Sequence, residues 1–472
     1  MPAYALLTDL YELTMLAGYF EQGMHQVPAT FDLFFREAPF TGGYGVAAGL
    51  DPALEYLENL RFSEEDLEYL ESLHLFRGAF IAYLSAFRFQ GQVTAVPEGT
   101  AVFANEPILS VEAGLAEAQL VETALLNTIN FQTLIATKAS RVVRAAAPGK
   151  VIEFGLRRAH GPDGGLSAAR AAAVGGVLTT SNVAAGKAYG LPVAGTQAHS
   201  WVMAFPTELD AFRAYARSFP TSTMLLVDTY DTLKTGIPNA ITVARELKQA
   251  GHRLLGVRLD SGDLAYLSRE ARRMLDEAGF PDVKIMGSNE LDEYVIESIR
   301  QGGGRVDLYG VGTRLATAAG PGGGALGGIY KMVEVDGRPK LKVSSDPAKS
   351  TIPGRKRLWR VIRPGGEYEM DVIALADEIL EPGAEVFDPT QPLRHTRIPE
   401  DTRLEDMRAV VMERGRRKCA VPALPALAKR TAEQLSNLPE GCLRFVNPYR
   451  YRVALSAKLH ELRVRLIEEA RG

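Results

Sequence analysis

Cysteine is scarce in this sequence: only Cys419 and Cys442 occur among 472 residues. So low a count supports neither a disulfide framework nor a zinc site built from several cysteines, and it fits a reducing cytoplasm. Long apolar runs are also missing, since none approaches the roughly 20 residues that a membrane-spanning helix needs. The opening residues carry Asp9 and Glu12 and lack the basic start and apolar stretch of a signal peptide.

An excess of charge of either sign is absent as well. The chain has 53 Lys and Arg against 57 Asp and Glu, a formal net charge of −4, which gives no general case for binding nucleic acid or an anionic membrane. The length exceeds what one hydrophobic core usually holds. We predict an N-terminal α+β domain (1–132), an α/β barrel-like catalytic domain (133–335) and a C-terminal extension (336–472) that packs on both.

Short β-prone runs alternate with Ala-rich helices through the middle of the chain, and each run ends on small or polar residues. The runs are Val151–Phe154, Gly176–Leu178, Pro192–Ala194, Met224–Val227, Leu254–Val257, Val283–Met286 and Val306–Tyr309. This alternation predicts a parallel (β/α) barrel of irregular form better than an open sheet. Towards the C-terminus we predict a hairpin turning at Asp336-Gly337 and helices near Leu404–Arg414, Leu427–Ser436 and Ser456–Glu469.

Acidic residues gather after two of these runs. Arg258, Asp260 and Asp263 follow one, and Asp228 and Asp231 follow the run before it. Carboxylates at strand ends can bind sugar hydroxyls or Mg²⁺, and an arginine beside them can bind an anion. A single Asp at such a place usually caps a helix. Capping is an incomplete explanation for all of them together.

Two glycine loops follow the last two runs, Gly287-Ser288-Asn289 and Gly310-Val311-Gly312-Thr313. Glycines let backbone N–H groups approach a phosphate, and consecutive late barrel strands are a known place for phosphate loops. Ordinary glycine turns are the alternative.

One histidine stands out by its position. A lone histidine is more often structural than catalytic, but His199 lies among small residues just past a run, a position that raises the odds of a general base or nucleophile. Phe154 followed by Arg157 suits a planar anion, although exposed arginines are often only solvated. The basic run Lys349–Arg360 is open to the same two interpretations.

Ordered motifs along nearly the whole chain resemble those of the nicotinate phosphoribosyltransferases, members of the type II phosphoribosyltransferases. The matching stretches are LLTDLYELTM (6–15), FFREAPFTGGYGVAAGL (34–50), EFGLRRAHG (153–161), GTQAHS (195–200), LLVDTYDTLKTGIPNA (225–240), GVRLDSGDL (256–264), GSNELDE (287–293), GVGT (310–313), KVSSDPAKSTIPGRK (342–356) and NPYRYRVALS (447–456).

The resemblance implies that nicotinate and 5-phosphoribosyl 1-diphosphate give nicotinate mononucleotide and pyrophosphate in NAD salvage. ATP hydrolysis would be coupled through a phosphohistidine at His199, and Mg²⁺ would enter with the diphosphate and use Asp228 or Asp260. A homodimer with shared active sites is also implied, in which Tyr11 and Arg36 act in trans. The remaining implied roles are catalysis by Asp260, nicotinate binding by Tyr11, Phe154, Arg157, Thr196 and Arg258, and phosphoribosyl or diphosphate binding by Arg36, Asp228, Gly287, Ser288, Gly310, Gly312, Thr313 and Lys349.

Rival functions stay open. Relatives that prefer nicotinamide carry an acid after the second barrel run, where this chain has Ser181-Asn182, so the acidic substrate is the better prediction. Quinolinate phosphoribosyltransferases are shorter and have no ATP-linked histidine. A non-catalytic phosphosugar-binding barrel would need a lost functional residue, and none is missing. A barrel aldolase or epimerase would need a lysine at a strand end for a Schiff base.

Overall fold

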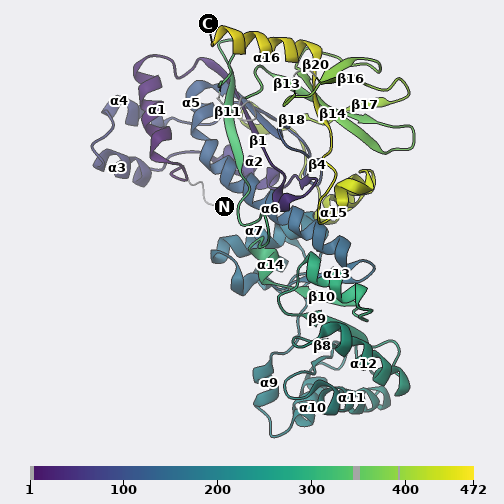
Figure 1. Cartoon of the computed structure of the whole chain (residues 1–472). Helices are drawn as coiled ribbons and strands as arrows, with labels where there is room; N and C mark the ends of the chain where they lie inside the picture. The colour runs from purple at the N-terminus through teal and green to yellow at the C-terminus, as the bar shows by residue number, and fades with distance from the viewer. Residues whose placement is uncertain (1–4, 344–350, 392–393, 472) are drawn as a thin grey trace. The chain divides into compact units, whose positions relative to one another are not determined.

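The computed structural model describes residues 5–343, 351–391 and 394–471. By contacts the chain divides into two compact units, the first made of Met1–Thr137 and Pro321–Gly472 and the second of Lys138–Gly320. The long helix α6 (Glu122–Ala146) carries the chain from one to the other. The colours of Figure 1 show that early and late segments share the first unit. The predicted three-domain boundaries stay a prediction.

The first unit begins with a helix, a strand and a run of short helices. Its early elements are α1 (Leu10–Glu21), β1 (Pro28–Phe35), β2 (Gly45–Val46), α2 (Leu50–Asn59), α3 (Glu64–Ser72), α4 (Gly78–Ser85), β3 (Gln92–Ala95), β4 (Ala101–Val102), β5 (Leu109–Gly114) and α5 (Leu115–Leu120). A capping box begins α3, because the Ser63 side chain accepts from Asp66 N and Asp66 accepts from Ser63 N.

The later elements of this unit are mostly strands. They are β11 (Gly328–Val335), β12 (Arg338–Pro339), β13 (Lys356–Ile362), β14 (Tyr368–Leu375), β15 (Glu385–Phe387), β16 (His395–Arg397), β17 (Arg403–Asp406), β18 (Ala409–Glu413), β19 (Arg416–Arg417), α15 (Leu424–Ser436), β20 (Val453–Ser456) and α16 (Ala457–Glu469). The hairpin β11–β12 turns at Asp336-Gly337 as predicted. The helices predicted near 427–436 and 456–469 are confirmed as α15 and α16.

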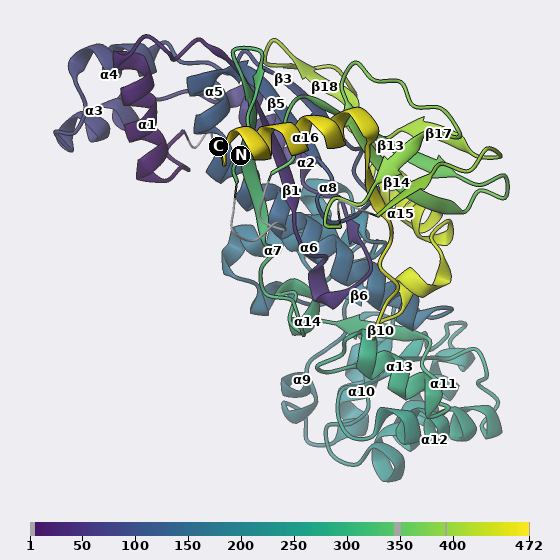
Figure 2. The ribbon, with the colours of Figure 1, turned by 45° about the horizontal axis from the view of Figure 1, so that its top comes forward.

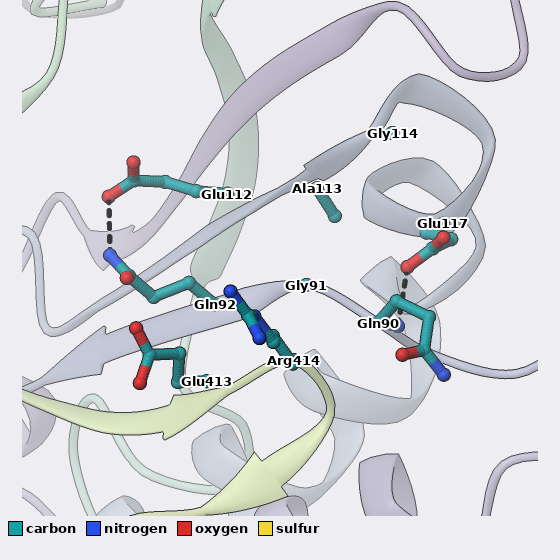
Figure 3. Close-up of a pocket in the computed structure, with 9 residues that line it drawn as sticks. All are labelled: Gln90, Gly91, Gln92, Glu112, Ala113, Gly114, Glu117, Glu413 and Arg414. Atoms are coloured by element: carbon teal, nitrogen blue, oxygen red, sulfur yellow. Dashed lines mark hydrogen bonds between the residues drawn. The ribbon is translucent and has the colours of Figure 1, made fainter.

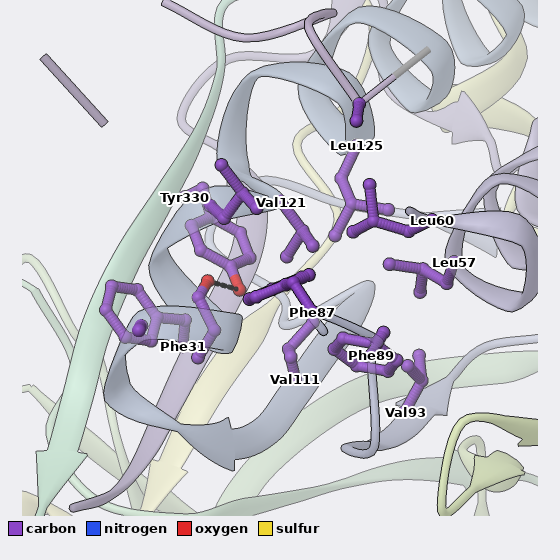
Figure 4. Close-up of a cluster of buried hydrophobic side chains, with 14 of the residues drawn as sticks. Phe31, Leu57, Leu60, Phe87, Phe89, Val93, Val111, Val121, Leu125 and Tyr330 are labelled. Carbon is purple, nitrogen blue, oxygen red and sulfur yellow. Dashed lines mark hydrogen bonds between the residues drawn. The ribbon is translucent and has the colours of Figure 1, made fainter. Parts of the chain in front are cut away.

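A seven-stranded antiparallel sheet joins strands far apart in the sequence, in the order β12-β11-β1-β5-β3-β18-β19. One face buries the main core of the unit, where Phe31 stacks on Tyr330 with ring centroids 5.0 Å apart (Figure 4). Leu57, Val111 and Leu125 reach the same core from a helix, a central strand and the start of α6. Figure 2 shows α16 passing over the strands of this unit.

A second sheet of six strands, ordered β16-β15-β20-β14-β13-β17, completes the unit. Arg360 is buried on β13 and holds Asp371 of β14 with Nη2 2.6 Å from Oδ2. The same guanidinium donates to Gln434 of α15 at 2.7 Å and to the carbonyl of Ala101 at 2.8 Å. Such a buried charge is tolerable because every side of it is bonded.

The helix predicted near Leu404–Arg414 is wrong. The segment forms β17 and β18, which pair with β13 and β3. Leu404, Met407 and Val411 recur at helical spacing, but ladder bonds to strands more than 40 residues away decide the conformation.

The second unit carries a five-stranded parallel sheet in the order β6-β10-β9-β8-β7. Its strands are β6 (Lys150–Glu153), β7 (Met224–Leu226), β8 (Gly256–Leu259), β9 (Lys284–Ser288) and β10 (Leu308–Val311). Its helices are α7 (Gly161–Val174), α8 (Val183–Tyr189), α9 (His199–Met203), α10 (Glu208–Ser218), α11 (Ile237–Gln249), α12 (Leu264–Glu277), α13 (Glu293–Gln301) and α14 (Thr313–Ala316).

Single parallel bridges extend this sheet beyond β6, from Glu153 to Thr180 and from Thr180 to Val193. Segments that follow one another in the chain are therefore neighbours in this sheet, and the last strand, β10, pairs with the first, β6. Between the Val193 end of this sheet and β7 at its other end, the contact is made by the side chain of Gln197. With its amide nitrogen turned towards Met224, Gln197 donates to Met224 O at 2.7 Å and accepts from Leu226 N at 3.2 Å. The α/β fold of irregular barrel form is confirmed.

Parallel order directs the carboxyl ends of these strands to one edge, where catalytic residues of α/β barrels lie. Two of the acids gathered there cap helices, as a single strand-end Asp usually does. Asp263 accepts from Tyr266 N at the start of α12, and Asp231 accepts from Lys234 N.

In the described part of the chain no helix is both long and apolar enough to cross a bilayer.

Candidate functional site at the carboxyl edge of the parallel sheet

Arg258, near the end of β8, is the hub of the site. Its three guanidinium nitrogens donate to three different residues: Nε to Ser288 Oγ at 2.8 Å, Nη1 to Thr196 Oγ1 at 3.0 Å and Nη2 to Asp260 Oδ1 at 2.8 Å. The guanidinium carbon also lies 5.4 Å from the centroid of the Phe154 ring. The planar fork of arginine fixes all these groups at once, which a lysine could not do.

Two aspartates form the acidic side of the site. Burial works against ionisation of Asp260, but the hydrogen bond from Ser288 and the charge of Arg258 outweigh it and hold the pKa of Asp260 below its ordinary value. Asp228 is buried, and its Oδ2 accepts from Asp260 N at 2.8 Å and from Ser261 Oγ at 2.6 Å. Its Oδ1 is buried without a hydrogen-bond partner among the described residues.

His199 is the first residue of α9, and its side chain is 40% exposed. Its Nδ1 lies 3.1 Å from Thr229 Oγ1, and its Nε2 lies 3.8 Å from Asp260 Oδ2. The imidazole therefore stands beside an anionic carboxylate and remains open to solvent, as a group that reacts with a bound molecule must be.

Phe154 closes one side of the site just past β6. Its backbone N–H donates to Val311 O at 2.8 Å. The ring packs against Gly310, where an added Cβ would come within 2.7 Å of two ring carbons and 3.3 Å of Ser288 Cβ. Gly310 therefore permits a close approach that any side chain would block.

The two glycine loops lie next to each other, because Gly310 of β10 pairs in register with Ser288 of β9. Across them, Thr313 Oγ1 donates to Glu290 Oε1 at 3.0 Å. Asn289 and Glu290 both have positive φ, 86° and 41°. Consecutive non-glycine residues in this region carry backbone strain, which tends to be kept at functional sites.

The structure thus brings together most of the predicted site residues, and leaves some apart. The residues gathered at this edge are Phe154, Thr196, His199, Asp228, Arg258, Asp260, Gly287, Ser288, Gly310, Gly312 and Thr313. Arg157 lies exposed in the single turn Leu156–Arg158 and makes no hydrogen bond to them. Tyr11 and Arg36 belong to the first unit, and Lys349 lies outside the described residues.

Thr229, Ser261 and Glu290 are contacts of the site that the sequence did not single out. Their hydroxyl and carboxylate groups resemble those of any loop residue, and only the pairing of strands shows what they face. Ser261 stood inside the RLDSGD stretch, so its place beside the two aspartates was the most accessible to prediction.

The first unit carries a surface pocket of about 330 Å³. Its polar wall includes Gln92, Glu112, Glu117 and Arg414 (Figure 3). Glu112 accepts from Gln92 Nε2 at 3.4 Å, and Glu117 accepts from the backbone N–H of Gln90 at 2.7 Å. Only Gln92 and Glu112 of these four are bonded to each other in the described structure, and none of the four belongs to the predicted site.

Comparison with known proteins covers nearly the whole chain. Residues 6–130 match the family model of the nicotinate phosphoribosyltransferase N-terminal domain, 149–363 the family model itself and 355–463 that of the C-terminal domain. A nicotinate phosphoribosyltransferase of Bacillus subtilis is 44% identical over 485 residues, covering 98% of this chain and 97% of that protein. One from Bos taurus is 36% identical and covers 100% and 97%.

Solved structures agree. A crystal structure of human nicotinic acid phosphoribosyltransferase superposes with a TM-score of 0.88 at 32% identity, covering 97% of this chain and 99% of that one. A nicotinate-nucleotide pyrophosphorylase from Pyrococcus furiosus, with a TM-score of 0.71 and 24% identity, shares the fold.

Proposed function

The chain belongs to the nicotinate phosphoribosyltransferase family, and we propose that its barrel edge forms nicotinate mononucleotide and pyrophosphate from nicotinate and 5-phosphoribosyl 1-diphosphate, with ATP hydrolysis coupled through His199. The observation that carries the proposal is the set of contacts made by Arg258, which brings an aromatic ring, hydroxyls and an anionic carboxylate together at the carboxyl edge of the parallel sheet. Its place is NAD salvage.

Nicotinate is a flat anion, and two kinds of group at the hub suit it. The Phe154 ring offers a face for the pyridine, and Arg258 with Thr196 offers donors for the carboxylate. Nicotinamide lacks that negative charge, so a cationic hub favours the acid. Arg157, exposed on the same edge, is a second cation for the substrate.

The phosphoribosyl group would use the glycine loops. Backbone N–H groups and hydroxyls of Gly287, Ser288, Gly310, Gly312 and Thr313 suit a 5′-phosphate, and Asp260 suits the ribose hydroxyls. The pyridine nitrogen attacks C1 of the ribose, the C1–oxygen bond breaks, and pyrophosphate leaves with the bonding electrons. The protein's task is to hold the two reactants in line and to neutralise the leaving group.

Mg²⁺ fits this site through one orphaned oxygen. Asp228 Oδ1 is buried and unpartnered among the described residues, and Asp260 Oδ2 lies on the same side as His199. Mg²⁺ is usually held by one or two carboxylates together with substrate phosphates, and no larger metal-binding cluster occurs in the described structure. When bound, the ion would neutralise charge on the diphosphate, while Asp228 keeps the Asp260 backbone in place.

His199 would accept the phosphoryl group of ATP. Phosphorylation adds charge and acceptor oxygens beside the diphosphate position, and so can shift nearby loops between two states. His199 is exposed enough to meet a nucleotide, and Asp260 can stabilise the positive charge that the ring acquires.

Tyr11 and Arg36 lie in the first unit, and we infer that they complete the site of a second copy in a homodimer. Tyr11 is 46% exposed on α1, next to Leu10 at 52%. Tyr11 would cover the ring face opposite Phe154, and Arg36 and Lys349 would meet the diphosphate. A cytoplasmic location is part of the proposal.

The proposal is tested by supplying the purified protein with 5-phosphoribosyl 1-diphosphate, Mg²⁺ and either nicotinate, nicotinamide or quinolinate, each with and without ATP. We expect product from nicotinate, more of it with ATP. The His199→Ala variant should lose the ATP effect, whereas His252→Ala, an exposed histidine of the same unit, should keep it. Product from nicotinamide alone would contradict nicotinate as the substrate. Binding of 5-phosphoribosyl 1-diphosphate without turnover would indicate a non-catalytic phosphosugar-binding barrel. An ATP effect that persists in His199→Ala would contradict the coupling of ATP hydrolysis through His199.

A further inference from the structure

The two nitrogens of the His199 ring face different partners. Nε2 faces Asp260 Oδ2 at 3.8 Å, and Nδ1 faces Thr229 Oγ1 at 3.1 Å. A neutral imidazole carries one hydrogen, so one nitrogen donates and the other has a free lone pair. Which nitrogen holds the hydrogen decides which one can react.

Asp260 and Thr229 impose different requirements. Asp260 is kept ionised by Ser288 and Arg258, so it can only accept, and a hydrogen on Nε2 is attracted to it. Thr229 carries a hydroxyl that can either donate or accept, and no other hydrogen bond of its side chain occurs among the described residues. Its hydroxyl is therefore free to donate to the lone pair on Nδ1.

We propose that Thr229 is a positioning residue that fixes the tautomer of His199, by donating its hydroxyl hydrogen to Nδ1 while Nε2–H faces Asp260. The inference rests on the proposed role of His199 as phosphoryl acceptor. Thr229 is not among the site residues predicted from the sequence. Because the tautomer of His199 is a property of the protein without substrate, the proposal can be tested on the free protein as well as during turnover.

The chemistry balances in this arrangement. The Nδ1 lone pair forms a bond to the γ-phosphorus of ATP, the bond from that phosphorus to the β–γ bridging oxygen breaks, and ADP leaves with the electron pair. No proton leaves the ring, because Nε2 keeps its hydrogen and the positive charge lies next to Asp260. Thr229 must turn aside at this step, and rotation about one χ1 bond is enough.

The first test is on the unaltered protein. Long-range proton–nitrogen correlation spectra of protein labelled with 15N-histidine distinguish the two tautomers, and the His199→Gln variant identifies the His199 signals among the 7 histidines. We expect the hydrogen on Nε2. A hydrogen on Nδ1 would overturn the proposal, whatever any variant does.

The second test compares a matched pair of variants. Thr229→Val keeps the shape and removes the hydroxyl, and Thr229→Ser keeps the hydroxyl. We expect Thr229→Val to show a mixed tautomer and to form acid-labile phosphohistidine from ATP about 3- to 10-fold more slowly, the worth of one hydrogen bond. Thr229→Ser should restore both towards the unaltered protein.

A control makes the same chemical change elsewhere. Thr242→Val removes a hydroxyl that donates only to the carbonyl of Pro238 within α11, and both readouts should stay unchanged. Thr229→Val matching this control in tautomer and phosphorylation rate would overturn the proposal. If His199→Ala kept its ATP effect, the coupling would fail while the tautomer result still stood, so the two failures are distinguishable.

Discussion

Two largely buried arginines in this protein each make hydrogen bonds to several partners at once. Arg258 joins three residues at the sheet edge, and Arg360 joins a strand, a helix and a backbone carbonyl in the first unit. Satisfied on all sides, such groups specify one arrangement, since losing any partner would leave a buried charge unpaired. Glu12 is the opposite case, a buried carboxyl to which no cation of the described residues is bonded.

Glu12 predicts a pH dependence of stability. Burial, with the nearby charge of Glu122, raises its pKa to about 8. An unfolded glutamate ionises near pH 4.5, so the contribution of Glu12 to folding is fully present below that pH and is lost as the pH rises through about 8. At pH 9 the free energy of unfolding of Glu12→Gln should therefore exceed that of the unaltered protein by on the order of 2 kcal/mol after allowing for solvent screening, and the variant should unfold at a higher temperature.

Thermal unfolding at pH 5 and pH 9 checks this result. The two proteins should differ little at pH 5, where the carboxyl of Glu12 is protonated. Glu117→Gln provides a comparison at another glutamate whose pKa burial raises. Equal stability of Glu12→Gln and the unaltered protein at pH 9 would contradict the prediction.

At the scale of elements, the site depends on how closely β6, β9 and β10 approach one another. Glycines at their ends remove side chains from the contact, so the Phe154 ring lies directly over Gly310. The backbone of Gly310 needs no unusual φ, which means that the missing Cβ, not conformational freedom, is what the position requires.

Gly310→Ala should displace the Phe154 ring, because the new Cβ would come within 2.7 Å of it. We expect the KM for nicotinate to rise about tenfold, and stability to fall by about 1 to 3 kcal/mol from overpacking. Steady-state kinetics and nicotinate binding by calorimetry measure the effect. Gly164→Ala in α7, where an added Cβ has only a contact at 3.9 Å, is the control. A normal KM in Gly310→Ala would show that the ring position does not matter for nicotinate.

The alternation of strand, loop and helix in the second unit was predictable, because each short β-prone run ends on small or polar residues that mark the end of the strand. The segment near 404–414 was not, because strands from elsewhere in the chain override its helical spacing. The same holds for the site. The sequence itself marks the strand ends at which Arg258, Asp260 and His199 lie. The role of Thr229, by contrast, follows only from its distance to His199, which is 30 positions away in the chain.

At the scale of the whole molecule, the proposed homodimer with shared sites predicts complementation. Tyr11→Ala and His199→Ala damage a site from different copies if Tyr11 acts in trans. Mixing the two variants under conditions that exchange subunits should then restore about a quarter of the ATP-stimulated rate, since half of the dimers are mixed and each mixed dimer has one intact site.

The rate of the mixture is compared with that of each variant alone at equal total concentration. A Tyr11→Ala and His199→Ala double variant, mixed with neither, provides the background. No gain on mixing, with subunit exchange demonstrated by mass, would mean that Tyr11 serves its own chain's site or none.

The pairing of β1 with β11 has a consequence for how the chain is made. Ala29 lies opposite Val335 in the seven-stranded sheet, so one edge of β1 has no partner until some 300 residues more have been synthesised. At typical rates of elongation that interval is roughly 15 to 60 s. The second unit lies wholly within the interval and contains all its own strands. It can therefore fold on the ribosome first, while the unit that precedes it in the sequence waits for its last strands to emerge.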